Sequence, residues 1–136
     1  MLIGRSRALI ALIAIVLVTA ALYWPGLDGT FFFDDHPNIV DNKAVQPASF
    51  SFANLTAAAL SSPASDFKRP LASLTFAANF LVTGLSPFWF KLTNLLIHLA
   101  NGLLLYLVML RIWRFAWPER GDGDARLTAL LVAAIW

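Results

Sequence analysis

Two adjacent carboxylates, Asp34 and Asp35, are the side chains in this sequence best suited to chemistry. They follow three phenylalanines and lie shortly after an apolar segment that is long enough to cross a membrane. A carboxylate in that position could act as a general base and take a proton from an acceptor hydroxyl. It could equally bind a divalent cation, because carboxylate oxygens are suitable ligands for one. The segment DDHPN is also a good turn sequence, so a purely structural role for the two acids stays open.

Arg69 and His98 are candidate binding residues. The planar guanidinium of Arg69 suits a phosphate group, although an arginine that starts a helix at the surface explains it as well. His98 shares a helical face with Lys91, Asn94 and Asn101, because the spacings between the four are three, four and three residues. Polar groups in hydrocarbon are costly unless they have partners, so we expect this polar stripe to face other helices or a cavity. A packed histidine inside the membrane is the simpler interpretation of His98.

The composition places the chain in the membrane class. It is 59% hydrophobic and 13% charged, whereas soluble globular domains usually carry about 25% charged residues. The net charge of +2 comes from scattered basic residues, which argues against nucleic acid as a partner. The absence of cysteine excludes disulfides, thiolate metal sites and cysteine nucleophiles.

Two apolar segments predict an all-α membrane protein. We expect transmembrane helices over about 7–24 and 88–113, because roughly 17–20 apolar residues span the hydrocarbon core. The first could also be a cleaved signal peptide, but its apolar run exceeds the usual core of about 7–15 residues. Between them, residues 25–87 are expected to form a long loop outside the cytoplasm. We expect short amphipathic helices in that loop, around residues 52–60 and after Pro70.

The sequence ends in a third apolar segment. A charged cytoplasmic connection over 114–126 leads into residues 127–136, and about ten residues cannot cross a bilayer as a helix. We therefore expect the start of a third transmembrane helix here. The whole of 1–136 is then the N-terminal part of a larger transmembrane domain.

The basic residues predict the orientation of these helices. Cytoplasmic segments carry an excess of lysine and arginine, so the N-terminal tail and the second connection are expected in the cytoplasm. The acidic pair would then lie on the outer face. The residues concerned are Arg5 and Arg7 in the tail, Arg111, Arg114, Arg120 and Arg126 around the connection, and Lys43, Lys68 and Arg69 in the much longer loop, with Lys91 at its membrane edge.

Four short motifs follow one another in an order that is typical of one enzyme family. They are Asp34–Asp35 after the first apolar segment, Arg69–Pro70–Leu71 before an amphipathic helix, Ser86–Pro87–Phe88 at a turn, and Asn94 to Asn101 within a helix. With these motifs the chain resembles the start of GT-C-type integral membrane glycosyltransferases. The likeness is greatest to bacterial relatives of the transmembrane and tetratricopeptide-repeat O-mannosyltransferases.

The resemblance implies transfer of a sugar, such as a hexose or mannose, from a polyprenyl-phosphate carrier to an acceptor hydroxyl on the outer membrane face. It gives the base role to Asp34 first and Asp35 second, with a divalent metal at the same acids as the alternative. Arg69 and His98 would lie near the carrier. The implied location is a bacterial inner membrane with the acids in the periplasm, and the implied partners are the bilayer, the lipid-linked sugar and the remaining helices of the enzyme.

The chain is short for this family. Members usually have many more transmembrane helices, so we expect the isolated chain to be inactive. A small non-enzymatic membrane protein that acts as a subunit of a larger complex is the alternative, and it predicts a defined membrane partner at fixed stoichiometry. A third explanation is the unproductive relic of a broken gene.

Overall fold

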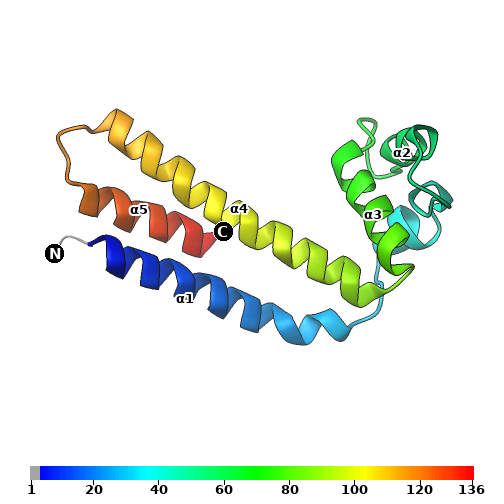
Figure 1. Ribbon diagram of the computed structural model, residues 1–136, viewed down its shortest axis with the longest axis horizontal. Coiled ribbons are helices and arrows are strands. Elements are labelled where there is room, and N and C mark those ends of the chain that lie inside the picture. The colour runs from blue at the N-terminus through cyan, green and yellow to red at the C-terminus, as the bar shows by residue number, and fades with distance from the viewer. Residues whose placement is uncertain (1–3) are drawn as a thin grey trace. The chain divides into compact units, whose positions relative to one another are not determined.

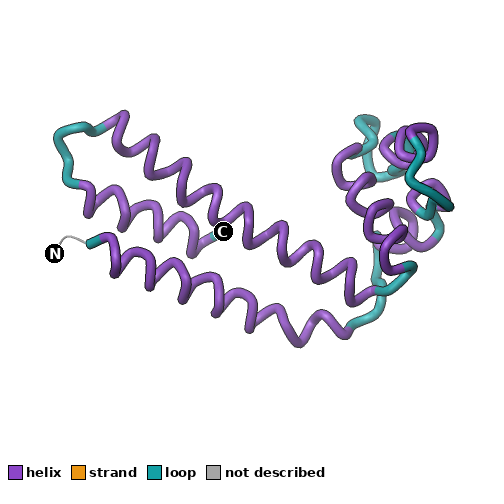
Figure 2. Tube along the Cα trace, viewed as in Figure 1, coloured by secondary structure: helices purple, strands orange, loops and turns teal. Residues whose placement is uncertain are grey.

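The computed structural model describes residues 4–136, and within that range every regular element is a helix (Figure 1, Figure 2). The predicted all-helical fold class is therefore confirmed. The chain divides into two compact units. The long-helix unit contains the described chain up to Pro25 together with Asn94–Trp136, and the loop unit contains Gly26–Thr93.

Two helices are long and apolar enough to cross a membrane. Helix α1 (Arg5–Tyr23) continues into the short 3-10 helix η1 (Trp24–Asp28). Helix α4 (Pro87–Ala116) has 30 residues and is therefore about 45 Å long. Only 6% of the apolar stretch of the first helix and 11% of that of α4 is buried, whereas the core helix of a soluble protein is mostly buried. Their exposed apolar surfaces fit contact with lipid.

The ends of the later helices differ from the predicted ones. Helix α4 runs to Ala116 and stops there, because Pro118 disfavours helical backbone at the residue before it. Helix α5 (Asp122–Ile135) begins inside the predicted connection over 114–126. Two aspartates in the first turn of α5 stabilise this earlier start, since negative charge complements the positive end of the helix dipole.

Helix α5 packs against α1, and small side chains form most of its buried face. Ala125, Ala129 and Ala133 are buried and lie on one face of α5, because each is four residues from the next. Small residues at such a face let two helices approach closely. In Figure 1, α5 lies between α1 and the C-terminal half of α4.

The loop unit is built around two shorter helices. Ser51 caps α2 (Phe52–Ala59), and its hydroxyl accepts a hydrogen bond from the Asn54 amide at 3.2 Å. Helix α3 (Pro70–Thr83) starts at a proline, which is favoured in the first turn, and ends at Gly84 with a φ of +65°. The two helices pack against each other. The small core of this unit consists of Val45, Ala58 and Ala77, with Phe76 packed against it.

Candidate functional site

The two acids belong to a tight turn formed by Phe32, Phe33, Asp34 and Asp35. A hydrogen bond from the Asp35 amide to the Phe32 carbonyl closes the turn at 3.0 Å. Phe33 has a φ of +43°, in the left-handed region that costs a residue with a side chain roughly 1–2 kcal/mol. The carboxylate of Asp35 offsets part of this cost, because it accepts a hydrogen bond from the Phe32 amide at 2.9 Å.

Asp34 and Asp35 therefore have different environments. Asp35 is partly buried, and its carboxylate is engaged in the turn. Asp34 is exposed, and within residues 4–136 its carboxylate has no hydrogen-bond or ion-pair partner. Of the two acids, it is Asp34 that keeps both oxygens available to a substrate or ligand.

A buried asparagine holds the backbone of Asp34. Asn38, in the single-turn helix η2 (His36–Val40), donates from its backbone and side-chain amides to the Asp34 carbonyl, at 3.2 and 2.8 Å. The side-chain oxygen of Asn38 accepts a hydrogen bond from Ser62 Oγ at 3.0 Å. Asn38 and Ser62 are only 8% and 3% exposed, so water does not compete for this hydrogen bond. The acidic turn is thus tied to a segment 24 residues later.

A second asparagine connects the same two segments. Asn42 Nδ2 donates to Ser61 Oγ at 2.9 Å, while its side-chain oxygen accepts from the Ala44 amide and caps the short helix η3 (Lys43–Val45). The sequence patterns did not identify the two asparagines or the two serines as parts of the site. Both pairs lie in turn-rich segments, and spacing along the chain does not reveal that such segments meet.

The three phenylalanines before the acids have two kinds of environment. Phe31 packs edge-to-face on the buried ring of Phe90, and the two ring centroids are 5.6 Å apart. The ring of Phe90 also packs near that of Phe76 in α3, with 6.1 Å between the ring centroids. Phe32 and Phe33 are instead 64% and 79% exposed. One ring therefore anchors the turn to α4, and the other two present apolar surface beside the acids.

Lys68 and Arg69 form a second strained segment of the loop unit. Their φ angles are +60° and +45°, and with Phe33 they are the non-glycine residues with positive φ in the described part of the chain. Such strain is retained where the surrounding structure imposes it, and it is concentrated at functional sites. Ser73 helps to impose it here, because its amide donates to the Arg69 carbonyl at 3.1 Å and its hydroxyl to the Lys68 carbonyl at 3.4 Å.

Asp34, Asp35 and Arg69 lie in the same unit. The contact with Ser62 joins the acidic turn to the loop that leads into Arg69. The side chain of Arg69 is exposed, and no ion pair connects it to either acid within residues 4–136. Its positive charge is therefore available to an external anion.

Within residues 4–136, the acidic turn does not bring a third acidic or histidine side chain together with Asp34 and Asp35 at a possible metal site. Nowhere in residues 4–136 do three or more histidine, aspartate or glutamate side chains gather in a way that could hold a metal ion. A divalent cation at Asp34 and Asp35 would need additional ligands, so no chemical step is assigned to a metal here.

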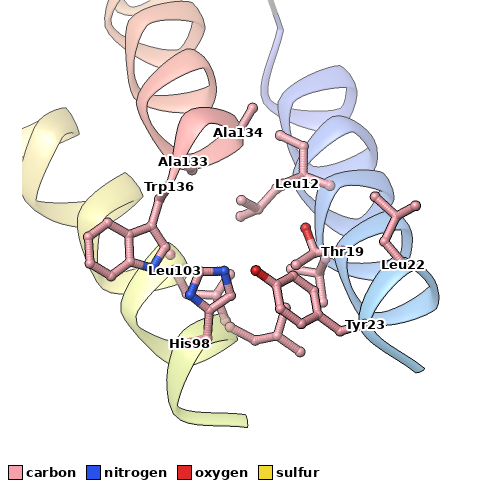
Figure 3. A pocket seen from close by; sticks show the side chains of 13 residues that line it. Leu12, Thr19, Leu22, Tyr23, His98, Leu103, Ala133, Ala134 and Trp136 are labelled. Atoms are coloured by element: carbon pink, nitrogen blue, oxygen red, sulfur yellow. The ribbon is translucent and has the colours of Figure 1, made fainter. Parts of the chain in front are cut away.

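His98 belongs to the long-helix unit, whereas the two acids belong to the loop unit. Its ring lies between Tyr23 of α1 and Trp136, with ring centroids 5.6 and 5.8 Å away (Figure 3). These side chains line a cavity of about 180 Å³ between α1, α4 and α5, whose other lining residues are mostly aliphatic. His98 therefore faces a cavity, as expected for the polar stripe.

The other members of the polar stripe differ from one another. The ammonium group of Lys91 donates to the Gly26 carbonyl at 3.1 Å, so Lys91 has a partner within the loop unit. Asn94 and Asn101 are exposed. The expectation that the stripe faces partners is thus met by Lys91 and His98, and not by the two asparagines within the described chain.

Known proteins with sequences similar to this one share a single activity in their names. The chain is 32% identical over 118 residues to the mouse protein O-mannosyl-transferase TMTC3, a match that covers 83% of this chain and 12% of that protein. Human protein O-mannosyl-transferase TMTC1 is 30% identical over 118 residues, which is 82% of this chain and 13% of the relative. Human TMTC3 is 35% identical over 89 residues, or 62% of this chain and 10% of the relative. The chain is a homologue of part of these proteins. No family model and no solved structure matches it.

The homology confirms the predicted relation to O-mannosyltransferases. A match over 83% of the chain must span its middle, so it includes both acids, Arg69 and His98 wherever it begins. The chain spans only 12% of the length of mouse TMTC3. The similarity therefore supports homology with these transferases over the segment that contains the candidate site.

Proposed function

We propose that this chain supplies part of a membrane glycosyltransferase. The enzyme would move a hexose, such as mannose, from a polyprenyl-phosphate carrier to an acceptor hydroxyl. The observation that carries this proposal is the homology to protein O-mannosyl-transferases across most of the chain. Two long apolar helices with exposed surfaces support the membrane location. The comparisons give no support to a non-enzymatic complex subunit.

Asp34 is the proposed general base. As the bond from the sugar to the acceptor oxygen forms, the bond from the sugar to the carrier phosphate breaks and polyprenyl phosphate leaves. The acceptor hydroxyl must lose its proton in this step, and a positioned carboxylate can take it. Three features support Asp34 over Asp35: its side chain is exposed, its oxygens are not engaged, and its backbone is fixed by Asn38. Asp35 is then the residue that maintains the turn.

The outer face of the membrane is the proposed place for this reaction. Basic residues are concentrated in the N-terminal tail and around the connection between α4 and α5, which the positive-inside rule assigns to the cytoplasm. The loop unit would then be extracytoplasmic, and in a bacterial inner membrane it would be periplasmic. The exposed rings of Phe32 and Phe33 suit the interface between bilayer and water.

The experiment that tests the proposed function compares membranes with and without this chain. The coding sequence is disrupted at its native locus, and transfer of labelled sugar from a polyprenyl-phosphate donor to protein is measured in isolated membranes. Loss of transfer, restored by re-expression of the intact locus, is expected. Unchanged transfer, with the chain shown to be present in wild-type membranes, would count against the proposal.

Arg69 is the proposed contact for the carrier phosphate. Changing Arg69 to glutamine is expected to raise the KM for the lipid-linked donor by about 10–100-fold, because a hydrogen bond to a charged group is worth about 1.5–3 kcal/mol. The change in kcat should be smaller. Lys68→Gln is the matched control, since Lys68 is the neighbouring residue, is basic and exposed, and also has a left-handed backbone conformation. Equal rises in KM for both variants would show that Arg69 acts only through its positive charge and makes no specific contact with the carrier phosphate.

A further inference from the structure

A basic cavity lies in the long-helix unit, at the end of the unit where α4 is followed by the connection to α5. It has a volume of about 400 Å³. Residues from three helices line it: Arg5, Ala8, Leu9 and Leu12 of α1, Tyr106, Leu110 and Arg114 of α4, and Arg126 of α5. Neither the acidic turn nor the His98 cavity shares its charged residues.

An aspartate holds two of the three arginines of this cavity in place. Asp122 accepts hydrogen bonds from Arg114 Nε and Arg126 through its two carboxylate oxygens, each at 3.0 Å. The side chain of Arg126 is only 13% exposed. Arg5 comes from α1 and adds a third positive charge that Asp122 does not neutralise. Within residues 4–136, the three guanidinium groups of the lining and the carboxylate that pairs with two of them leave an excess of two positive charges.

The remaining lining of the cavity is apolar. Ala8, Leu9, Leu12 and Leu110 provide aliphatic surface, and Tyr106 adds an aromatic ring with a hydroxyl group. A small free anion could bind the guanidinium groups but would leave the aliphatic surface uncovered. A phospholipid can contact both, because its phosphate binds the guanidinium groups and its acyl chains cover the aliphatic side chains. Basic pockets between transmembrane helices are known to bind anionic lipid headgroups.

We propose that this cavity binds an anionic phospholipid, with the headgroup phosphate at Arg5, Arg114 and Arg126 and an acyl chain along Leu9, Leu12 and Leu110. The lipid would join α1 to α4 and α5 at the basic end of the unit. By the positive-inside rule, this is the cytoplasmic leaflet. The lipid site is separate from sugar transfer and does not depend on the proposed enzymatic role.

The test measures lipid retention by the full chain purified in detergent. Native mass spectrometry compares the dissociation constants of phosphatidylglycerol and phosphatidylcholine, and inorganic phosphate is added as a competitor. Arg5→Gln is the main variant, because Arg5 lies outside the Asp122 ion pairs. Arg7→Gln and Arg111→Gln are the matched controls, since both are exposed arginines on the same helices and neither lines the cavity. Circular dichroism checks that each variant keeps its helix content.

The wild-type chain is expected to prefer phosphatidylglycerol to phosphatidylcholine. Arg5→Gln should weaken binding of phosphatidylglycerol about fivefold, and Arg5→Gln with Arg114→Gln more strongly, because each basic residue near an anionic surface contributes about 1 kcal/mol. Equal weakening by Arg7→Gln or Arg111→Gln would overturn the proposal in favour of diffuse charge. Displacement of the lipid by millimolar phosphate would overturn it in favour of a small-anion site.

Discussion

Replacing Asp34 with asparagine is expected to lower the rate of sugar transfer by about 10²–10⁴-fold, the usual contribution of a positioned general base. Asparagine keeps the size of the side chain and cannot take up the proton. The backbone contact with Asn38 uses the Asp34 carbonyl, so the turn should persist. The rate is measured in membranes of the native host at constant protein level.

Two other aspartates of the same segment serve as comparisons for that result. Asp41→Asn is the matched control, since Asp41 is exposed and lies just after η2. Asp35→Asn should have a modest effect, because the amide oxygen can still accept the hydrogen bond from Phe32. Normal turnover in both the Asp34 and Asp35 variants would mean that the acids are structural.

Replacing Asn38 with alanine is expected to destabilise the loop unit by about 2–4 kcal/mol, because both side-chain hydrogen bonds of Asn38 are lost in a buried environment. The hydroxyl of Ser62 loses its acceptor, while the Asp34 carbonyl keeps only the hydrogen bond from the backbone amide of residue 38. Amide hydrogen exchange in the full chain reports this as faster exchange across residues 34–42 and 58–65. Sugar transfer should fall as well, since the backbone that carries Asp34 loses an anchor.

Two comparisons separate the Asn38–Ser62 contact from a general effect of substitution. Asn54→Ala is the control, because the side-chain amide of Asn54 donates only exposed hydrogen bonds, to Ser49. This substitution should lower the free energy of unfolding by less than about 1 kcal/mol. A double-mutant cycle of Asn38→Ala with Ser62→Ala should give a coupling energy of about 0.5–3 kcal/mol. A coupling near zero would show that the hydrogen bond between them does not stabilise the unit.

The long helices could be predicted from sequence because their signal is local. An apolar run long enough to cross a bilayer identifies α1 and α4 without knowledge of any contact. The end of α4 at Ala116 depends on Pro118, which the sequence also contains. The earlier start of α5 depends on two aspartates that the prediction assigned to a charged connection rather than to a helix N-terminus.

The interior of the candidate site could not be predicted in the same way. The partners of Asn38 and Asn42 are 24 and 19 residues away, and no periodicity connects them. The left-handed backbone at Phe33 and Arg69 was also unexpected, because local rules assign that conformation to glycine or asparagine. Tertiary contacts impose both features, so only the structure shows how the acidic turn is held.

If Asp34 takes the proton of the acceptor hydroxyl, a nucleophile that carries no proton should react without help from Asp34. Azide is such a nucleophile, so its attack on the sugar needs no base. The measurement compares wild type with Asp34→Asn for transfer to the hydroxyl acceptor and for transfer to azide, in the same membranes with the same polyprenyl-phosphate donor. We expect the variant to lose about 10²-fold or more with the hydroxyl acceptor and less than about tenfold with azide. Equal losses with both nucleophiles would contradict the base role.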